Sequence, residues 1–244
     1  MQSALSATPA ALTADAPVVA LRGVEFGWTP RGAALLRVDA LEVLPGERLL
    51  LRGPSGSGKS TLLQLMAGVL VPRTGTVELL GQGLPGMTGA RRDRLRADHV
   101  GFVFQLFNLI PYLTVVQNVT LPCLFSARRR ARATVASGSV EAEARRLLGR
   151  LGLSDPELLE RPVTALSVGQ QQRVAAARAL MGAPELLIAD EATSALDADA
   201  REAFLDLLLR ECAASGAALV FVSHDASLAS AFHRSVPMEA LNRG

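Results

Sequence analysis

A glycine-rich segment of the sequence combines the residue types that bind phosphate. It reads Gly53-Pro54-Ser55-Gly56-Ser57-Gly58-Lys59-Ser60 and fits the pattern G-x-x-x-x-G-K-[ST]. Glycines allow backbone N–H groups to close around an anion, because no Cβ blocks the required dihedral angles. The Lys59 ammonium could reach the outer phosphates of a nucleotide, and the Ser60 hydroxyl could ligate Mg²⁺. The segment therefore predicts a nucleotide site.

The sequence on either side predicts the elements that would position this segment. Residues 47–52 form a short apolar run after the turn pair Pro45-Gly46 and predict a strand. Residues 61–67 predict a helix, whose free N–H groups and positive dipole end would face bound phosphate. A Gly/Ser-rich surface loop is the alternative, but the strand before and the helix after favour phosphate binding.

Two further apolar runs end on residues that could complete such a site. Residues 186–189 are followed by Asp190 and Glu191, and residues 218–222 are followed by Ser223 and His224. Asp190 could hold Mg²⁺, and Glu191 could act as the general base for a water that attacks the γ-phosphate. A neutral His224 imidazole could donate a hydrogen bond to that phosphate. The alternatives are a turn aspartate and a structural histidine.

The rest of the chain predicts an α/β fold. Strands that alternate with helices indicate a parallel sheet with its chemistry at the carboxyl ends of the strands. Short β-like runs within 17–52 predict a small sheet before the glycine-rich segment, and 106–165 reads as an inserted, mostly helical lobe. Within that lobe, 141–153 has helical spacing. Residues 1–16 predict a disordered tail rather than a signal peptide.

Composition narrows the possible partners. The 244 residues suit one domain with a sub-lobe, and a net charge of +2 is too small to indicate nucleic acid. No uncharged run reaches about 18 residues, so we expect no membrane-spanning helix. Two cysteines give no disulfide framework and fit a reducing cytoplasm. We interpret two arginine clusters as solvated surface, with contact to anionic lipid or an acidic partner as the alternative. They are Arg91, Arg92, Arg94 and Arg96, and Arg128, Arg129, Arg130 and Arg132.

A second candidate anion site lies in the segment 166–180. Ser167 suits a helix N-cap, and the Ala- and Leu-rich sequence after it predicts a helix. The amino end of this helix would offer a hydroxyl, free N–H groups and a positive dipole. Taken alone, the segment could equally be an ordinary capped helix.

With these motifs, the sequence resembles the nucleotide-binding subunit of ATP-binding cassette (ABC) transporters over residues 17–235. The motifs follow the family's order: the phosphate loop at 53–60, Gln105 as the Q-loop, the signature at 166–170, Walker B at 186–190, Glu191, the D-loop Ser194-Ala195-Leu196-Asp197 and His224 as the switch. The resemblance implies a P-loop NTPase of the ABC type over 17–244. Its core sheet would be mostly parallel, with an N-terminal antiparallel β subdomain and a helical subdomain at about 106–165.

The resemblance also implies the site residues and a mechanism. Two chains would pair head to tail, with each ATP between the phosphate loop of one and 167–170 of the other. Catalysis would use Glu191, His224, Gln105 and Lys59, and Mg²⁺ would be held by Ser60, Gln105 and Asp190. ATP would be bound by Trp28, Gly53, Pro54, Ser55, Gly56, Ser57, Gly58, Lys59, Ser60, Thr61, Ser167, Gly169, Gln170 and Asp197. Trp28 would stack on the base, although core packing is an alternative for this side chain.

The sequence departs from the family pattern at two positions. Val168 stands where the signature usually has glycine, and Ala192 stands where proline usually follows the catalytic glutamate. We expect Val168 to weaken the ATP-bound dimer modestly, because its side chain limits the approach of the backbone to the γ-phosphate. Ala192 removes no chemical group, so we expect activity to survive.

The segment 101–122 resembles the lipoprotein-releasing, macrolide-export and cell-division branch of the family. This resemblance implies an ATPase that drives an integral membrane permease, of export or extrusion type, from the cytoplasmic face of the membrane. A non-transport ABC ATPase that acts on envelope, division or nucleic-acid machinery is the alternative. We expect no direct contact with nucleic acid.

Overall fold

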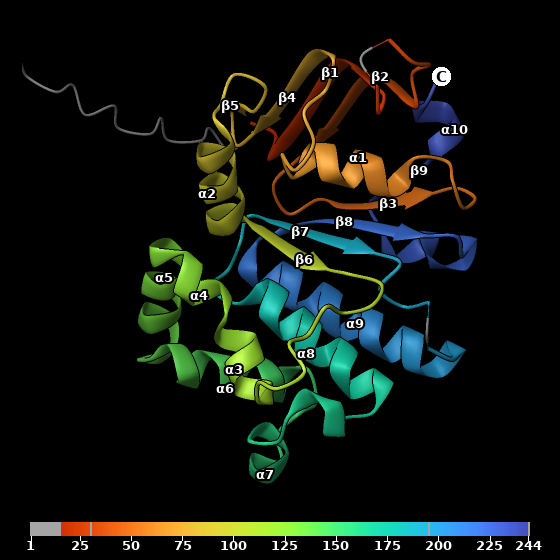
Figure 1. Ribbon diagram of the computed structural model, residues 1–244. Coiled ribbons are helices and arrows are strands. Elements are labelled where there is room, and N and C mark those ends of the chain that lie inside the picture. The colour runs from red at the N-terminus through yellow and green to blue at the C-terminus, as the bar shows by residue number, and fades with distance from the viewer. Residues whose placement is uncertain (1–15, 30, 195, 244) are drawn as a thin grey trace, which may run out of the picture.

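Two β-sheets form the framework of the computed structural model, which describes residues 16–29, 31–194 and 196–243 (Figure 1). The predicted tail lies outside the described residues except for Ala16. The first sheet is antiparallel, in the order β2-β1-β4-β5. Its strands are β1 (Val19–Phe26), β2 (Leu36–Val43), β4 (Thr74–Leu79) and β5 (Gln82–Gly83).

The second sheet is parallel at every pairing, in the order β6-β7-β8-β3-β9. Its strands are β3 (Arg48–Arg52), β6 (Val100–Val103), β7 (Leu186–Asp190), β8 (Ala218–Ser223) and β9 (Arg234–Pro237). The prediction of an α/β fold with a parallel core sheet and an N-terminal antiparallel sheet is therefore confirmed. Strand β9 was not predicted.

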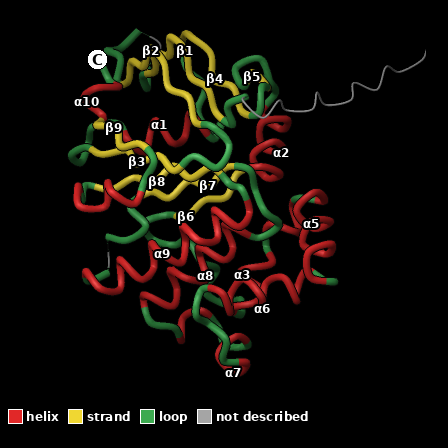
Figure 2. The backbone as a smooth tube through the Cα atoms, turned by 180° about the vertical axis from the view of Figure 1, so that it is seen from behind, coloured by secondary structure: helices red, strands yellow, loops and turns green. Residues whose placement is uncertain are grey.

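The parallel sheet is covered on both faces. Successive side chains of a strand point to opposite sides of the sheet, so those of one strand enter two different cores. Leu49 and Leu51 of β3 pack in one core with α1 (Lys59–Met66) and the antiparallel sheet. Leu50 belongs to the other core, with α8 (Val168–Leu180) and α9 (Ala198–Ser215). Figures 1 and 2 show α1 between the two sheets and α8 and α9 on the opposite face. Strands buried on both faces explain why these runs are continuously aliphatic.

The segment between β6 and α8 is helical. It contains α3 (Val115–Thr120), α4 (Pro122–Phe125), α5 (Ala127–Ser137), α6 (Val140–Arg150), α7 (Pro156–Leu159) and the 3₁₀ turn η1 (Val163–Ala165). The helix predicted at 141–153 is α6, and the apolar residues that suggested it are all buried: Ala144, Leu147, Leu148 and Leu151. The boundaries 106 and 165 of a separate subdomain stay a prediction.

The remaining helices flank the sheets. They are α2 (Gly89–His99), the 3₁₀ turn η2 (Ala226–Ala231) and α10 (Met238–Leu241). Among the described residues, no helix is both long and apolar enough to cross a membrane. Cys123 and Cys212 are free and buried, and burial raises the pKa of both thiols, that of Cys212 to about 12.

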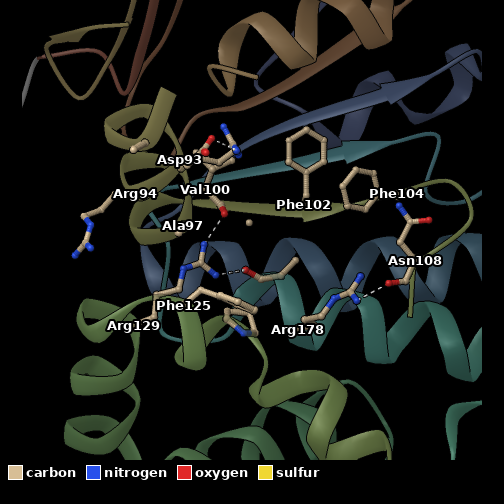
Figure 3. A pocket seen from close by; sticks show the side chains of 15 residues that line it. Asp93, Arg94, Ala97, Val100, Phe102, Phe104, Asn108, Phe125, Arg129 and Arg178 are labelled. Atoms are coloured by element: carbon tan, nitrogen blue, oxygen red, sulfur yellow. Dashed lines mark hydrogen bonds and ion pairs between the residues drawn. The ribbon is translucent and has the colours of Figure 1, made fainter. Parts of the chain in front are cut away.

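One member of the second arginine cluster is buried, which corrects its interpretation as solvated surface. Arg129 of α5 is 2% exposed, and burial lowers its pKa to about 10, so it stays protonated at neutral pH. Its guanidinium donates to the carbonyl oxygens of Val100 at 2.5 Å and Ala179 at 3.4 Å (Figure 3). It also donates to the carbonyl oxygen of Met181 at 3.2 Å. Arg129 therefore ties the helical segment to β6 and to the end of α8.

We expect Arg129→Met to lower the free energy of unfolding by about 3 kcal/mol, because it removes a buried cation and leaves three carbonyl groups without their donor. Urea denaturation would measure the change. Arg210→Met is the control, since Arg210 and its partner Asp206 are each 63% exposed and such a pair contributes less than about 1 kcal/mol. Equal losses in the two variants would contradict this role for Arg129.

Candidate functional site

The phosphate loop connects β3 to α1 at the carboxyl edge of the parallel sheet. Gly58 is the N-cap of α1 and has a φ of 93°, a left-handed conformation that favours glycine. Gly56, with a φ of 82°, is also left-handed. These two glycines let the chain turn from the strand into the helix, whose free N–H groups then face the loop.

Lys59 is almost fully buried within this loop. Its ammonium donates to the carbonyl oxygens of Gly53 and Pro54, both at 2.8 Å, and lies 3.6 Å from a Glu191 carboxylate oxygen. The side chain is 6% exposed. The lysine therefore places a positive charge between the loop and the end of β7, where it would attract a bound anion.

The two predicted carboxylates stand together at the end of β7. Burial raises the pKa of Asp190, partly offset by a hydrogen bond with Ser60, and the nearby Glu191 carboxylate raises it further. Glu191 has a φ of 46°, which is uncommon for a residue with a Cβ, and its N–H donates to the carbonyl of Val222 in β8 at 3.2 Å. The turn thus directs Glu191 toward Lys59 rather than along the strand.

A cavity of about 400 Å³ brings most of these groups together. It is lined by Leu35, Ser55, Gly56, Gly58, Lys59, Ser60, Thr61, Gln105, Asp190 and Glu191. All but Leu35 were predicted from the sequence. Gly53, Pro54 and Ser57 belong to the loop itself, and the buried Ser57 hydroxyl has no hydrogen-bond partner among the described residues.

The predicted signature residues lie away from this cavity. Ser167 caps α8 by accepting from the N–H of Gln170 at 3.3 Å, and the Gln170 side chain accepts from the N–H of Ser167 at 2.9 Å. Val168 is 49% exposed at the first position of the helix. A Cβ on Gly169 would find its nearest neighbour, Leu196, at 3.9 Å. The capped helix end therefore presents an open surface to a molecule outside the chain.

The other predicted residues do not line the cavity. His224 is exposed directly after β8, at the same sheet edge as Asp190. Trp28 is 68% exposed and meets Phe26 edge to face, with ring centroids 5.2 Å apart. Asp197 caps α9 by accepting from the N–H of Ala200 at 2.8 Å. Ala195 of the predicted D-loop lies outside the described residues.

Two links around the site were not predicted from the sequence. Gln172 of α8 is fully buried and donates to the carbonyl of Ala192 at 2.5 Å, so it ties the signature helix to the turn after Glu191. Arg201 of α9 pairs with Asp225, beside His224, at 2.5 Å. A glutamine or arginine in a helix carries no signal in the sequence for such a contact.

The donor set fits a phosphate chain and a divalent cation. Loop N–H groups, Lys59 and the unpartnered Ser57 hydroxyl can donate to phosphate oxygens. Asp190, Glu191 and the Ser60 hydroxyl present oxygen atoms to the same cavity. Oxygen ligands of this kind suit Mg²⁺.

Known proteins of similar sequence indicate the family to which the chain belongs. A family profile described as ABC transporter matches residues 36–194. The chain is 39% identical over 222 residues to the lipoprotein-releasing system ATP-binding protein LolD of Novosphingobium aromaticivorans, an alignment that covers 90% of this chain and 95% of the relative. It is 45% identical over 190 residues to the uncharacterized ABC transporter ATP-binding protein YbbA of Escherichia coli, covering 78% and 79%.

Solved structures give the same result. The dimeric structure of the bacterial ABC transporter cassette MJ0796 matches with a TM-score of 0.76 and 32% identity, covering 90% of this chain and 93% of that one. Its post-hydrolysis state bound to ADP and Pi matches with a TM-score of 0.75 and 33% identity, covering 92% and 94%. The chain therefore belongs to the ABC transporter family, as an ATP-binding subunit that hydrolyses ATP.

Proposed function

We propose that the protein works as a head-to-tail homodimer that binds two ATP molecules and drives a membrane permease of export type. The observation that carries this proposal is the separation of two anion-binding features. Lys59 and the phosphate loop line one side of the cavity, whereas the Ser167 end of α8 faces outward. A second chain in antiparallel orientation would bring its Ser167 to the open side of each ATP. The dimeric state of the similar cassette MJ0796 supports this arrangement.

Within each site, the position of each residue would determine its role in binding or hydrolysis. The loop N–H groups and Lys59 would hold the β- and γ-phosphates and stabilise the negative charge that develops on them. Ser60, Asp190 and Gln105 would hold Mg²⁺, which would neutralise charge on the phosphate oxygens. Glu191 would take the proton from the attacking water, and His224 would donate a hydrogen bond to the γ-phosphate. Trp28 would stack on the base.

A large groove beside the Q-loop supports a membrane partner. It has a volume of about 760 Å³ and is lined by the stacked rings of Phe102 and Phe104, 4.8 Å apart, and by Phe125, which is 77% exposed (Figure 3). Arg94, Arg96 and Arg178 also line it. We infer that a cytoplasmic segment of the permease docks here, with the protein on the inner face of the cell membrane. Gln105 follows Phe104 directly and would connect the groove to the ATP site.

The assignment of Glu191 as the general base predicts a trapped state. Glu191→Gln keeps the size of the side chain but cannot accept a proton, so turnover should fall at least about a hundredfold. The variant should accumulate as an ATP-bound dimer, measured by size-exclusion chromatography with Mg²⁺ and ATP. Glu202→Gln, an exposed change on α9, should behave as wild type. Wild-type turnover by Glu191→Gln would show that Glu191 is not the base.

The exposed Val168 predicts a weaker dimer than glycine would allow. In the Glu191→Gln background, Val168→Gly should tighten ATP-dependent dimerisation by about threefold, because a side chain is removed from the surface that meets the γ-phosphate. Analytical ultracentrifugation would measure the dimer dissociation constant. Val69→Gly is a matched control, since Val69 is 48% exposed and lies outside any helix or strand. An unchanged constant in Val168→Gly would remove this role for Val168.

The docking groove predicts a separation of binding from hydrolysis. Phe125→Asp replaces an exposed aromatic ring of the groove with a charge and should reduce co-purification with the permease by about tenfold or more. The ATPase rate of the isolated subunit should stay within about twofold of wild type, because Phe125 does not line the nucleotide cavity. Val135→Asp on α5 is the control, because Val135 is 88% exposed and outside the groove. Full retention of the permease by Phe125→Asp would place docking elsewhere.

A further inference from the structure

The C-terminal segment of the chain lies against the phosphate loop, although it contains none of the nucleotide-binding motifs (Figure 1). Strand β9 pairs in parallel with β3, and the last pair in the register is Arg52 with Pro237. The next residues along the two strands are Gly53, which opens the phosphate loop, and Met238, which begins α10. The register of β9 therefore delivers Met238 to the base of the loop.

Met238 packs between two glycines of that loop. Its side chain is fully buried. A Cβ placed on Gly53 would stand 3.0 Å from the Met238 Cβ, and one placed on Gly58 would stand 3.9 Å from its terminal methyl group. Met238 thus fills the space beneath the two points where the loop leaves the strand and enters the helix. Because the left-handed Gly58 has no side chain of its own to fix its position, the packing around it must do so.

Asn242 connects the same segment to another wall of the cavity. Its side-chain amide donates to the carbonyl of Leu35 at 3.1 Å, and its side-chain oxygen accepts from the N–H of Arg37 at 2.9 Å. Leu35 lines the nucleotide cavity. Leu36 lies between the two bonded residues and approaches the phosphate loop, 3.3 Å from a Cβ placed on Gly58. One amide therefore holds the backbone on both sides of Leu36, next to the cavity and the phosphate loop.

We propose that Met238 and Asn242 are positioning residues for ATP binding: they hold the phosphate loop and the Leu35 wall in the conformation that receives the nucleotide. Neither side chain lines the cavity, so both act through the backbone of other residues. Lys59 adds to the need for such support, since its ammonium donates to carbonyls of the loop. A loop that shifted at Gly53 would also move the lysine and the N–H groups that face phosphate.

The packing half of the proposal is tested with three methionine variants. Met238→Ala should weaken ADP binding, measured by calorimetry, by about fivefold or more, and raise the KM for ATP more than it lowers kcat. Met238→Leu, which keeps the volume, should restore binding to within about twofold. Met181→Ala is the matched control: Met181 is equally buried but lies in the other core. It should lower the unfolding midpoint and leave the Kd for ADP unchanged.

The hydrogen-bonding half is tested at the partly exposed Asn242, where folding is not at risk. Asn242→Asp keeps an oxygen that can accept from the Arg37 N–H but loses the donor to Leu35. It should therefore weaken ADP binding about threefold. Arg243→Ala removes only an exposed ion pair with Asp39 and should bind ADP as wild type does. This comparison remains decisive if Met238→Ala does not fold.

The inference rests on the nucleotide site of the proposed function. Different experimental results would contradict the nucleotide site and the positioning role. A wild-type protein that bound no ADP would contradict the nucleotide site itself. A wild-type Kd in Asn242→Asp, and also in Met238→Ala if that variant folds, would overturn the positioning role alone. A loss of affinity in Met181→Ala equal to that in Met238→Ala would also overturn it, because the effect would then follow from general loss of packing.

Discussion

Strands β8, β3 and β9 run parallel and are paired residue for residue, and this register decides where chemistry can occur. Arg52 at the end of β3 pairs with Ser223 on one side and Pro237 on the other. The strands therefore stop together, and the chain leaves each of them at one edge of the sheet. The phosphate loop and helix α10 begin there. The turn at Glu191 begins at the same edge, because Asp190 of the neighbouring β7 pairs with Val222 of β8. A change of register in one strand would move its functional segment away from the others.

Charged groups of both signs lie together at this edge of the sheet. Lys59 is buried among carbonyl oxygens, close to Glu191, while burial raises the pKa of the neighbouring Asp190. One lysine and two carboxylates line the same cavity, where a phosphate chain would pair with the lysine and a divalent cation with the carboxylates. The hydrogen bond from Gln172 to Ala192 joins this arrangement to the outward-facing end of α8. The groups that would serve two different ATP molecules thus belong to one packed body.

The sequence was sufficient for the parts of the site that are contiguous along the chain. The phosphate-loop pattern is complete within the eight residues 53–60. Residues of this loop line the cavity, as the pattern predicts. Strand β9 escaped prediction because it is four residues long and contains a proline. Helix α2 escaped because only Leu95 is buried, which leaves no apolar periodicity. Arg129 stands between two exposed arginines, Arg128 and Arg130, and Gln172 follows two half-buried glutamines, Gln170 and Gln171, so residue type alone does not single them out. Only the rotation of each helix turns them inward, and that depends on tertiary packing.

The burial of both cysteines has a practical consequence for experiments that follow the protein through its ATP cycle. A thiol reacts as its thiolate, and the raised pKa values of Cys123 and Cys212, together with exposed fractions of 2% and 1%, keep both unreactive in the folded state. A cysteine introduced on the surface would therefore take up a maleimide dye or spin label selectively, with the native thiols left in place. Distances between two labelled subunits could then be followed through the ATP cycle by fluorescence or electron spin resonance, in a protein that is otherwise unaltered.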